Sequence, residues 1–506
     1  MTGRPLLFPP RAAVIPPLET STANDADATR LAWATWPADL ATPVQTFLAL
    51  RERGRRPCLL ESVEGPARLA RYTFVGADPV ASFRAGPAGN FLRDPSGERA
   101  LCGPAQDALR AAVASIPAPR PPRGLPPFCG GWVGWMAFEW ASALEPSVPR
   151  ATCDPWGVPD ATFELYQDVL AFDHASQRLY AIGAAPRGAR DLAAVHERLE
   201  RLAAEALAPA PPSGALGLCG EPRASVARAD FLDGVRALKS AISSGECFQA
   251  VLSQRFELEA QGDPFALYRV LRLVNPSPHM FFFEADGLAL IGSSPERLVA
   301  VRERCCETRP IAGTRPRGAD EADDERLARE LLASDKERAE HDMLVDLARN
   351  DLGRVARVGT VSVREHLALE RFARVQHLVS RVDGELACGR DALDALAACF
   401  PAGTVSGAPK VRALQLLAAL ERDTRGPYAG CFGYLDARGA LDMALSIRTF
   451  VLRNGVLSVQ AGAGVVFDSD PAAEHQETLH KAHALFDAAR LVGTPAFGAA
   501  RLHEVA

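Results

Sequence analysis

The sequence predicts a mixed protein of helices and β-sheets, of the α/β (α+β) class, with more than one domain. Its 506 residues allow two to four domains at roughly 100–200 residues each. Hydrophobic residues make up 48% and charged residues 23%, a composition typical of a packed chain. Helical patterns alternate with short β-rich runs, and the sequence shows no fixed-period repeat, which argues against a solenoid or a propeller.

The first region is expected to hold sheet with covering helices. Residues 1–30 predict a mobile tail, because prolines interrupt the apolar core that a signal peptide needs. Within the region 31–208, residues 57–79 alternate and turn like a pair of strands. Residues 115–135 run from a proline-rich crossing into a glycine-rich segment, and residues 189–208 predict a helix.

A linker rich in proline, glycine and serine is predicted at 209–225, and it separates this region from a second one at 226–492. Residues 231–260 predict a helix, a glycine stop and a strand. Long helical patterns follow at 323–350 and 468–492. The second of these has Ser469 or Asp470 as its N-cap and Pro471 in its first turn, and residues 493–506 form a C-terminal tail.

Charge and cysteine content exclude several classes of partner. Lys and Arg number 56 against 62 Asp and Glu, a net charge of -6, so no basic excess is available for a nucleic-acid backbone. No segment reaches the roughly 20 apolar residues of a membrane span. The eleven cysteines form no CxxC pair, which favours reduced thiols in the cytoplasm.

Glutamates recur three residues apart in both long helical patterns. Glu337 and Glu340 share one helical face, and so do Glu474 and Glu477. Two such faces in contact gather four carboxylates, which suit Mg²⁺ and an anionic substrate, whereas two separate solvated faces are the alternative. Lys481, four residues after Glu477, either pairs with that glutamate or binds a substrate carboxylate.

Histidines near these glutamates raise the possibility of another metal, with His341, His475, His480 and His483 as the candidates. The spacing from Glu477 to His480 fits half of a di-iron helical motif. The second Glu-x-x-His that such a site requires is missing, so the sequence argues against iron or zinc.

Two glycine-rich segments lack the spacing of nucleotide-binding loops. Residues 403–410 do not match a P-loop, and residues 461–467 lack the third glycine of a dinucleotide motif. Their glycines still allow backbone N–H groups to approach an anion. Arg448 could add a bidentate contact to a carboxylate, unless it is simply a surface residue of a strand.

Two residues suit proton transfer. Glu296 follows an apolar run, where partial burial would raise its pKa toward the range of a general acid. His377 is flanked by apolar residues and could exchange a proton near neutral pH. Taken singly, each residue type in such a setting more often has a structural role.

Taken together, the sequence resembles the chorismate-utilising enzymes, and within them the large subunit of anthranilate synthase. The resemblance spans roughly residues 38–490 and is carried by the ordered segments LLESVEG, GECFQAVLSQRF, NPSPHMFFF, GSSPERLV, RPIAGTRPRG, DKERAEHDMLVDLARNDLGRV, FPAGTVSGAPK, IRT and AGAGVVFDSDPAAEHQET. It implies a sandwich of antiparallel β-sheets covered by helices, with the two regions interlaced.

The resemblance also implies a reaction. Ammonia would add at C2 of chorismate, the C4 hydroxyl would leave, and pyruvate would be eliminated to give anthranilate. Glu340 and Glu477 would hold Mg²⁺ against the ring carboxylate, and Glu337 and Glu474 would support the ion through its waters.

Further roles in the substrate pocket follow from the same resemblance. Arg448, Tyr428 and the backbone at Gly462 and Gly464 would bind the enolpyruvyl carboxylate. Thr404 and Lys481 would contribute elsewhere in the pocket. Glu296 would be the general acid for the departing hydroxyl, and His377 would lie beside the ring and favour elimination.

Two positions separate related activities within the family. Gln249 stands where the water-using isochorismate and salicylate synthases carry a lysine base, which favours ammonia as the nucleophile. Ala312 stands where many aminodeoxychorismate synthases carry a lysine that attacks C2, and alanine cannot form that adduct. The alternatives are a 2-amino-2-deoxyisochorismate synthase, which His377 disfavours, an aminodeoxychorismate synthase component I that lacks the lysine, or a non-catalytic tryptophan binder.

The resemblance implies regulation and a partner as well. Tryptophan would inhibit by binding at residues of the LLES and NPSPHM segments, namely Leu60, Glu61, Ser62, Pro278, His279 and Met280. His279 stands where tyrosine is usual, and Phe467 and Arg297 also differ from the commonest residues. No GxCxG-like motif is present, so a separate glutamine amidotransferase subunit would supply ammonia in a hetero-oligomer.

Overall fold

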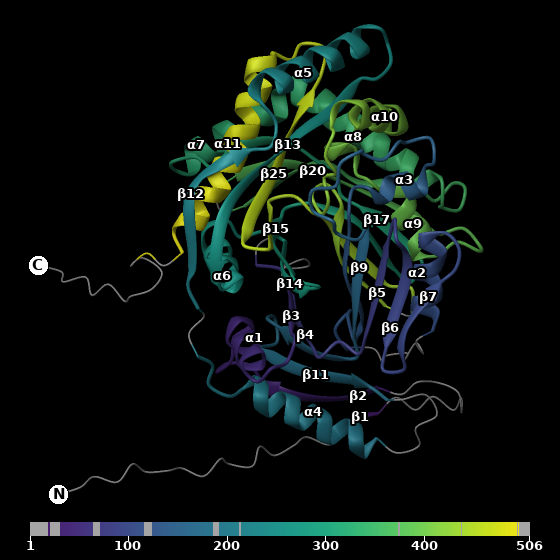
Figure 1. Ribbon diagram of the computed structural model, residues 1–506, viewed down its shortest axis with the longest axis vertical. Coiled ribbons are helices and arrows are strands. Elements are labelled where there is room, and N and C mark those ends of the chain that lie inside the picture. The colour runs from purple at the N-terminus through teal and green to yellow at the C-terminus, as the bar shows by residue number, and fades with distance from the viewer. Residues whose placement is uncertain are drawn as a thin grey trace, which may run out of the picture.

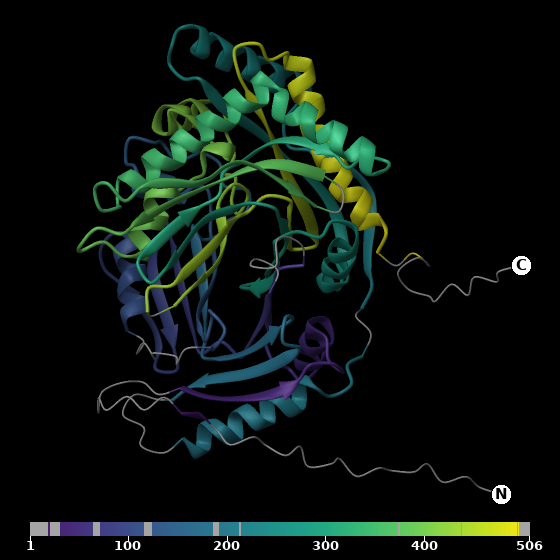
Figure 2. The ribbon, with the colours of Figure 1, turned by 180° about the vertical axis from the view of Figure 1, so that it is seen from behind.

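The computed structural model describes residues 19–20, 31–63, 71–115, 124–185, 192–211, 214–372, 375–436, 438–492 and 494. These residues form two large sheets with most helices on the outside (Figures 1 and 2). Neighbouring strands within each sheet run antiparallel, as the register of every strand pair shows. The predicted sandwich of antiparallel sheets covered by helices is confirmed.

The first sheet has thirteen strands in the described residues, with β21 beside β13 at one end. In spatial order twelve of them are β1 (Glu19–Thr20), β2 (Leu31–Pro37), β11 (Arg178–Ala184), β10 (Asp168–Asp173), β4 (Tyr72–Ala77), β3 (Cys58–Glu61), β14 (His279–Ala285), β15 (Leu288–Ser294), β24 (Thr449–Arg453), β25 (Val456–Val465), β13 (Gln249–Gly262) and β12 (Leu216–Ala224). The thirteenth, β21 (Gly407–Ala408), pairs with β13 outside this order.

The second sheet has twelve strands in the described residues, with β19 beside β20. In spatial order eleven of them are β18 (Ile311–Pro316), β20 (Val375–Glu385), β17 (Cys305–Thr308), β16 (Arg297–Arg302), β23 (Leu441–Leu445), β22 (Cys431–Leu435), β8 (Gly131–Met136), β9 (Ala161–Tyr166), β5 (Ala81–Gly86), β6 (Gly89–Asp94) and β7 (Gly97–Leu101). The twelfth, β19 (Ser362–Arg371), pairs with β20 outside this order.

Both sheets contain strands from both sequence regions. In the first sheet β3 pairs with β14, so that Glu61 lies opposite Met280. In the second sheet β8 pairs with β22, and Trp135 lies opposite Phe432. The two regions are therefore interlaced, as the resemblance implied, and a boundary in the sequence does not separate two structural units.

Eleven α-helices are present in the described residues, and most cover the outer faces of the sheets (Figure 1). They are α1 (Pro43–Glu52), α2 (Ala105–Ala114), α3 (Trp140–Leu144), α4 (Ala193–Ala206), α5 (Arg228–Ser243), α6 (Pro264–Val274), α7 (Glu321–Ala333), α8 (Asp335–Gly353), α9 (Ala392–Cys399), α10 (Lys410–Leu420) and α11 (Pro471–Arg490).

The three largest apolar clusters of the described residues lie in three layers. One cluster joins the first sheet to α1, α4, α6 and α11, and a second joins the second sheet to α2, α8 and α9. A third cluster contains Phe74 and Phe281 of the first sheet with Trp135 and Phe432 of the second, so it packs between the sheets. The rings of Phe281 and Phe432 stack with their centroids 4.1 Å apart.

The predicted linker at 209–225 is wrong in its second half. Residues Leu216–Ala224 form β12, which pairs with β13 from Leu216 opposite Gly262 to Ala224 opposite Phe256. The segment is polar and largely exposed because β12 is an edge strand. Backbone pairing to β13 makes it a strand where its composition indicates a loop.

The helical pattern predicted at 323–350 is divided into two helices. Ser334 ends α7 with extended backbone, and its hydroxyl accepts a hydrogen bond from the backbone N–H of Glu337 as the N-cap of α8. The second predicted helix has its cap at Asp470, whose carboxylate accepts from the backbone N–H of Ala473, and Pro471 follows directly.

The predicted tails, 1–30 and 493–506, fall outside the described residues apart from Glu19–Thr20 and Thr494. Glu19–Thr20 pair with β2 as strand β1, which the prediction of a tail did not include. Each of the eleven cysteines is free. None of the helices in the described ranges combines the length and the apolar character that crossing a bilayer requires.

Candidate functional site

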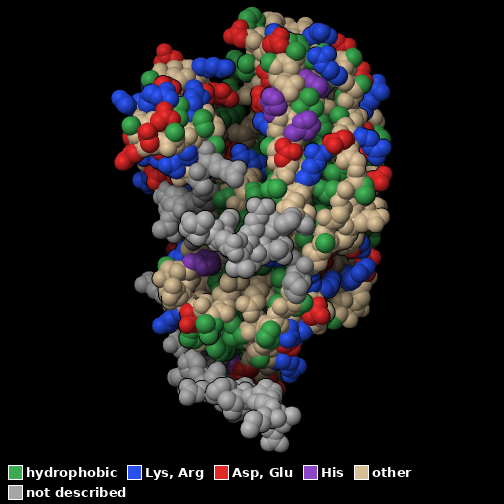
Figure 3. All heavy atoms as spheres, turned by 90° about the vertical axis from the view of Figure 1, so that its left-hand side faces the viewer, with side chains coloured by type: hydrophobic (Ala, Val, Ile, Leu, Met, Phe, Trp, Pro, Cys, Tyr) green, Lys and Arg blue, Asp and Glu red, His purple; other side chains and the backbone are tan. Residues whose placement is uncertain are grey.

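A cavity of about 920 Å³ opens between β13 and β25 of the first sheet, the loops of residues 403–405 and 446–448, and α11. Figure 3 views the side that carries α7 and α11, and there the surface is hollowed between a lobe crowded with charges and a face with histidines. All lining residues that the structure describes belong to the second region: Val251, Val274, Asn275, Thr314, Val375, Thr404, Val405, Tyr428, Ile447, Arg448, Gln460, Ala461, Gly462, His480, Lys481, Ala484, Leu485, Asp487, Ala488 and Leu491.

Arg448 is the principal cation of the cavity. It lies outside the strands, directly before β24, with a φ of 49°, a left-handed conformation that is uncommon for arginine. No carboxylate among the described residues pairs with its guanidinium, and burial lowers the pKa of this group. The side chain keeps some exposed surface only because it lines the cavity. An arginine held in this way suits an anionic ligand.

Tyr428 and the glycines of β25 form the wall beside Arg448. Burial raises the pKa of Tyr428 to about 12, so its hydroxyl stays protonated. A Cβ at Gly462 would lie 2.9 Å from the Tyr428 hydroxyl, and one at Gly464 would lie 2.7 Å from Nε2 of Gln249. Only glycine allows both side chains to approach the strand this closely.

Gln249 lies on the cavity face of β13, because it shares that face with Val251. Its side chain is 7% exposed. The buried Oε1 atom of Gln249 accepts no hydrogen bond from any described residue. A buried acceptor without a donor needs a partner, and an N–H group of a ligand in the cavity would supply one.

Glu296 and Thr404 form a buried pair at the cavity wall. Glu296 follows β15, as predicted, and the Thr404 hydroxyl donates to its Oε1 atom at 2.9 Å. Burial raises the pKa of Glu296 to about 7, and the Thr404 hydrogen bond opposes this shift. The carboxyl group is therefore protonated in a large fraction of molecules at neutral pH, as a general acid requires.

His377 lies on β20 beside the same cavity. Its Nδ1 atom is 2.9 Å from the hydroxyl of Thr314, which lines the cavity, and 3.3 Å from the backbone oxygen of Gly313. Burial lowers the pKa of His377, and the nearby positive charge of Arg448 lowers it further. The imidazole is therefore neutral at physiological pH.

The four predicted carboxylates come from two helices that approach each other. Burial raises the pKa of Glu340 on α8, and the negative charges of Glu337 and Glu477 raise it further. Burial raises the pKa of Glu474 on α11 as well, with a further contribution from Glu477. The faces of α8 and α11 thus lie close enough for their carboxylates to repel one another.

Two cations partly neutralise this group. Lys481 lies 2.6 Å from Glu477 and also donates to the backbone oxygen of Gly462 at 3.0 Å, so both predicted alternatives for this lysine place it at the cavity. Arg315 of β18 lies 3.1 Å from Glu337. No partner cation is described for Glu340 or Glu474 within the residues that the structure covers.

The carboxylate group fits a divalent ion of the Mg²⁺ type. Its donors are all oxygen atoms, and burial raises the pKa of two of them, with mutual repulsion adding to the shift. No three histidine, cysteine or acidic side chains in the described ranges are placed together as ligands of one ion. Such a cluster is not needed where two carboxylates, water and an anionic substrate share the coordination.

The histidines do not form a metal site in the described part of the chain. His341 is fully buried, and its Nε2 atom lies 2.6 Å from the hydroxyl of Ser380. His475 packs edge-on against the ring of Phe231. His480 lies 3.0 Å from the side chain of Gln476 on the same helix.

A second pocket, of about 130 Å³, lies where the two regions join. We call it the junction pocket, and its described lining residues are Leu60, Glu61, Ser62, Tyr72, Phe74, Pro127, Pro278, His279, Met280, Phe281, Arg297, Arg302, Phe432, Gly433, Tyr434, Asp442 and Ala444. All six residues predicted for a regulatory site are among them.

The polar groups of the junction pocket differ in their availability. The Glu61 carboxylate is fully engaged, because Arg272 donates to both of its oxygen atoms at 2.8 Å and the Tyr268 hydroxyl donates at 2.8 Å. The buried hydroxyl of Ser62 has no partner among the described residues. Burial lowers the pKa of His279 to about 4, and the charge of Arg297 adds to this effect, so the imidazole is neutral.

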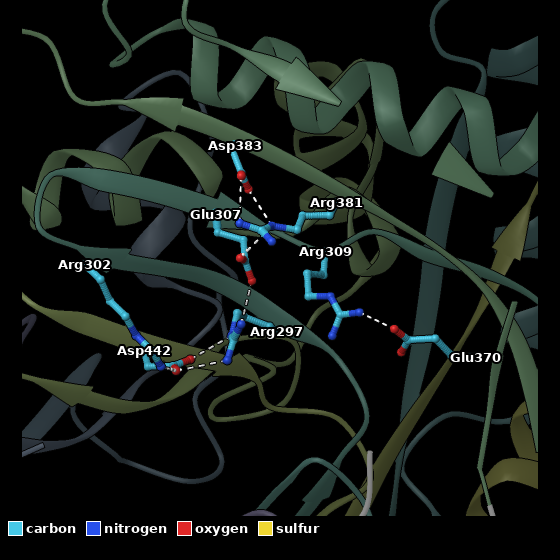
Figure 4. A network of polar contacts seen from close by, with 8 residues as sticks. All are labelled: Arg297, Arg302, Glu307, Arg309, Glu370, Arg381, Asp383 and Asp442. Atoms are coloured by element: carbon cyan, nitrogen blue, oxygen red, sulfur yellow. Dashed lines mark hydrogen bonds and ion pairs between the residues drawn. The ribbon is translucent and has the colours of Figure 1, made fainter. Parts of the chain in front are cut away.

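A network of ion pairs leads from the junction pocket across the second sheet (Figure 4). Arg297 binds Asp442 with two hydrogen bonds of 2.9 and 3.1 Å and Glu307 with one of 2.7 Å. Glu307 in turn lies 2.9 Å from Arg381 of β20, the strand that carries His377. The network therefore ties one wall of the junction pocket to a strand beside the cavity.

Sequence reasoning missed this network and part of the cavity wall. The partners Arg297 and Asp442 are 145 residues apart, and no local pattern connects them. The only signal was that Arg297 is unusual at its position. Asn275 and Gln460 also line the cavity without having been predicted. Arg448 was considered as a strand residue and lies between two strands instead.

Comparison with known proteins gives a consistent result. Residues 56–487 match the chorismate binding enzyme family. The chain is 44% identical to anthranilate synthase component 1 of Streptomyces coelicolor over 465 residues, which cover 89% of this chain and 87% of that protein. It is also 44% identical to anthranilate synthase component 1 of Thermus thermophilus, with 90% and 97% covered.

Solved structures agree with this. The crystal structure of anthranilate synthase component I from Streptococcus pneumoniae superposes with a TM-score of 0.75 at 34% identity, covering 89% of this chain and 98% of that one. The menaquinone-specific isochorismate synthase of Escherichia coli shares the fold, with a TM-score of 0.69 at 20% identity, covering 91% and 95%. The chain therefore belongs to the chorismate binding enzyme family and, within it, groups with anthranilate synthase component 1.

Proposed function

We propose that this chain converts chorismate and ammonia to anthranilate, pyruvate and water. The observation that carries the proposal is the pairing, in one cavity, of an arginine without a counter-ion and a buried carboxyl with a raised pKa. Arg448 suits a substrate carboxylate, and Glu296 suits proton donation to a leaving hydroxyl.

The choice of ammonia over water is supported by Gln249. An amide cannot act as a base toward water, and the free Oε1 atom of Gln249 can accept a hydrogen bond from an N–H group. Ala312 on β18 cannot form a covalent adduct with the ring. Both residues support direct addition of ammonia at C2.

Different residues of this chain act in the loss of the hydroxyl and in the elimination of pyruvate. The ammonia nitrogen forms a bond to C2, and the C4 hydroxyl leaves as water with the proton of Glu296. Thr404 holds that carboxyl in place by its hydrogen bond. Neutral His377 lies beside the ring, where loss of the C2 proton and cleavage of the C–O bond to the enolpyruvyl group release pyruvate.

We assign the Mg²⁺ site to Glu340 and Glu477, with Glu337 and Glu474 in support. The ion, when bound, supplies positive charge that holds the ring carboxylate of the substrate. Lys481 would then turn from Glu477 toward the substrate, while its contact with Gly462 keeps it at the cavity.

Tryptophan is the proposed ligand of the junction pocket. The pocket offers aromatic walls from Phe74, Phe432 and Tyr434, a free Ser62 hydroxyl and neutral His279. The names of the relatives, component 1, support a second subunit that supplies ammonia. The free thiols support a reducing, cytoplasmic setting.

The decisive experiment incubates the purified chain with chorismate, Mg²⁺ and ammonium at alkaline pH and identifies the products by fluorescence and mass. Anthranilate and pyruvate in equal amounts are expected, with less of both when tryptophan is added. Accumulation of an amino-dihydro acid without pyruvate would instead support one of the related synthases. No product at any ammonium concentration would refute the proposal.

A further inference from the structure

One buried arginine joins two walls of the cavity without lining it. Arg425 lies in the loop between α10 and Tyr428 and is 2% exposed. Its guanidinium donates twice to the Glu421 carboxylate, at 2.6 and 2.8 Å, and once each to the backbone oxygens of Val405, at 2.8 Å, and Val251, at 2.7 Å. Val251 and Val405 both line the cavity, and Arg425 is not among the described residues that do.

The contact with Val405 fixes the turn that carries Thr404. Residues Gly403–Val405 form a single 3₁₀ turn, and the Thr404 hydroxyl donates to Glu296 at 2.9 Å. The last backbone oxygens of a short helical turn have no partner within the turn. Arg425 supplies a partner one residue beyond Thr404. A shift of the guanidinium would therefore move the Thr404 hydroxyl relative to the Glu296 carboxyl.

The contact with Val251 completes an edge of β13 that has no neighbouring strand. β21 pairs with the beginning of β13, and β12 pairs with its second half. Between these stretches, in the described residues, two side chains take the place of a strand. Glu421 accepts from the backbone N–H of Ser253 at 2.9 Å, and Arg425 donates to the oxygen of Val251. The ion pair thus ties β13 to the turn at 403–405.

The backbone of Arg425 is anchored separately, by the first region of the chain. Glu139, directly before α3, accepts from the backbone N–H groups of Arg425 at 2.7 Å and Gly426 at 3.0 Å. The ring of Phe138 lies under the guanidinium, with its centroid 4.1 Å from the central carbon. Because the backbone contacts do not involve the guanidinium, a change of that group alone should leave the loop to Tyr428 in place.

We propose that Arg425 is a positioning residue, which holds the Thr404 hydroxyl against the Glu296 carboxyl in the geometry that proton donation requires. This inference rests on the proposed function, in which Glu296 donates a proton to the departing hydroxyl. Arg425 acts through the backbone of Val405 and exchanges no proton itself. Misplacing a reacting group by about 1 Å costs roughly 100-fold in rate.

The pH profile of the reaction reports on this contact. Within the described residues, burial raises the pKa of Glu296, the Thr404 hydrogen bond lowers it, and no charged side chain contributes. Loss of that hydrogen bond should therefore move the alkaline fall of kcat/KM to higher pH by up to about one unit. A residue that only stabilised the fold would leave the position of the fall unchanged.

The experiment compares R425K with R422K, a control whose parent side chain is exposed three residues earlier. Lysine keeps a positive charge beside Glu421, but its donors share one nitrogen and cannot span both backbone oxygens. With saturating ammonium, R425K should lower kcat roughly 100-fold and move the pH profile upward. KM for chorismate should change less than about threefold, because Tyr428 stays anchored. R422K should match the wild-type chain in all three quantities.

A double variant tests whether Arg425 acts through Thr404. In the T404V background, R425K should cause no additional shift of the pH profile, because the hydrogen bond to Glu296 is already absent. A further shift equal to that seen in the otherwise unchanged chain would overturn the inference.

A second substitution covers the case in which R425K does not fold, as judged by urea unfolding. R425M/E421M removes both charges together, so that no single charge remains buried. It should shift the pH profile as R425K does. Unchanged kcat and an unchanged pH profile in a folded variant would overturn the positioning role. A wild-type chain that forms no anthranilate would instead refute the proposed function, so the two failures are distinguishable.

Discussion

The junction pocket and the cavity differ in how their charged groups are neutralised. In the junction pocket, Arg297 is held by Asp442 and Glu307, and Glu61 is held by Arg272. In the cavity, Arg448 has no carboxylate partner among the described residues. The junction pocket lies where strands of both regions meet, whereas the cavity is built within the second region.

This difference distinguishes charged side chains that stabilise the fold from charged side chains that are available to bind a ligand. A buried charge with several partners fixes the elements that carry it, and removing one partner is costly. A buried charge without a partner, in a strained backbone conformation, is a feature of binding sites. Changes at Arg297 should therefore act on stability, and changes at Arg448 should act on catalysis.

The largest expected effect comes from replacing Arg448. We expect R448M to lower kcat/KM for chorismate by roughly 1000-fold, because a buried arginine contact to a carboxylate contributes about 3–5 kcal/mol when broken. The free energy of unfolding should not fall, since no ion pair is lost. Steady-state kinetics and urea unfolding test both statements, with R349M on the exposed face of α8 as the control. An equal loss of stability in R448M would contradict the conclusion that Arg448 serves ligand binding and not the fold.

Replacing Arg297 should show the reverse behaviour in unfolding experiments. We expect R297M to lower the free energy of unfolding by about 3 kcal/mol, because Asp442 and Glu307 lose their shared partner in a largely buried site. In R297M/D442L, where the Asp442 carboxylate is also removed, part of that loss should be recovered. A double-mutant cycle by urea denaturation measures the coupling, and a cycle without coupling energy would contradict the prediction.

A third prediction concerns metal binding by the carboxylates of α8 and α11. We expect E340Q to reduce Mg²⁺-dependent turnover by roughly 100-fold or more at limiting Mg²⁺, since one of two ligands is lost. E330Q on α7, an exposed residue paired with Arg326, should have no effect. Binding of Mn²⁺ in place of Mg²⁺, measured by electron paramagnetic resonance, should weaken in E340Q alone. Equal binding in both variants would exclude this ligand.

A smaller effect is expected at the junction pocket. We expect S62A to weaken inhibition by tryptophan roughly tenfold, because a hydrogen bond to a charged group contributes about 1.5–3 kcal/mol. The rate without tryptophan should be unchanged. Inhibition curves for S62A and for S147A, which alters an exposed serine, provide the test. If both variants were inhibited like the wild-type chain, the Ser62 hydroxyl would not contact the ligand.

The smallest expected effect is a shift of the pH profile. Because the pKa of Glu296 is raised to about 7, kcat/KM should fall as the pH rises above 7 and the acid loses its proton. Thr404 lowers this pKa by its hydrogen bond, so T404V should move the fall to higher pH by up to about one unit. The same raised pKa means that burial of Glu296 costs stability increasingly as the pH rises from about 4.5 through 7. Kinetics at constant free ammonia, and unfolding over the same pH range, measure the two effects.

The sequence predicted the fold class because the resemblance extended over most of the chain. It also predicted that the six junction-pocket residues form one site and that the carboxylates of the two helices form another. Both predictions were possible because these residues lie in recognisable sequence segments. It could not predict β12, because a polar edge strand depends on the strand beside it. Nor could it predict the division at Ser334, where a single serine cap decides between one helix and two.

The sequence also could not predict that, among the described residues, Arg448 lacks a carboxylate partner or that Gln249 Oε1 lacks a hydrogen-bond donor. A residue's type can be read directly, but the absence of a partner depends on every segment that folds around it. The network of Arg297 shows the same limit, since its partners come from strands β17 and β23. Long-range ion pairs leave no periodic signal that local patterns can detect.

Because each sheet combines strands from distant parts of the sequence, some strands are synthesised long before the strands they pair with. Strand β8 is complete at residue 136, but its neighbour β22 begins only at residue 431. At roughly 5–20 residues per second the ribosome needs about 15–60 s to make the intervening chain. During that time one edge of β8, with Trp132 and Trp135 on it, stays without its final partner. The emerging protein must therefore be protected from aggregation until nearly the whole chain has been translated, and it should fold poorly when synthesis stalls before residue 435.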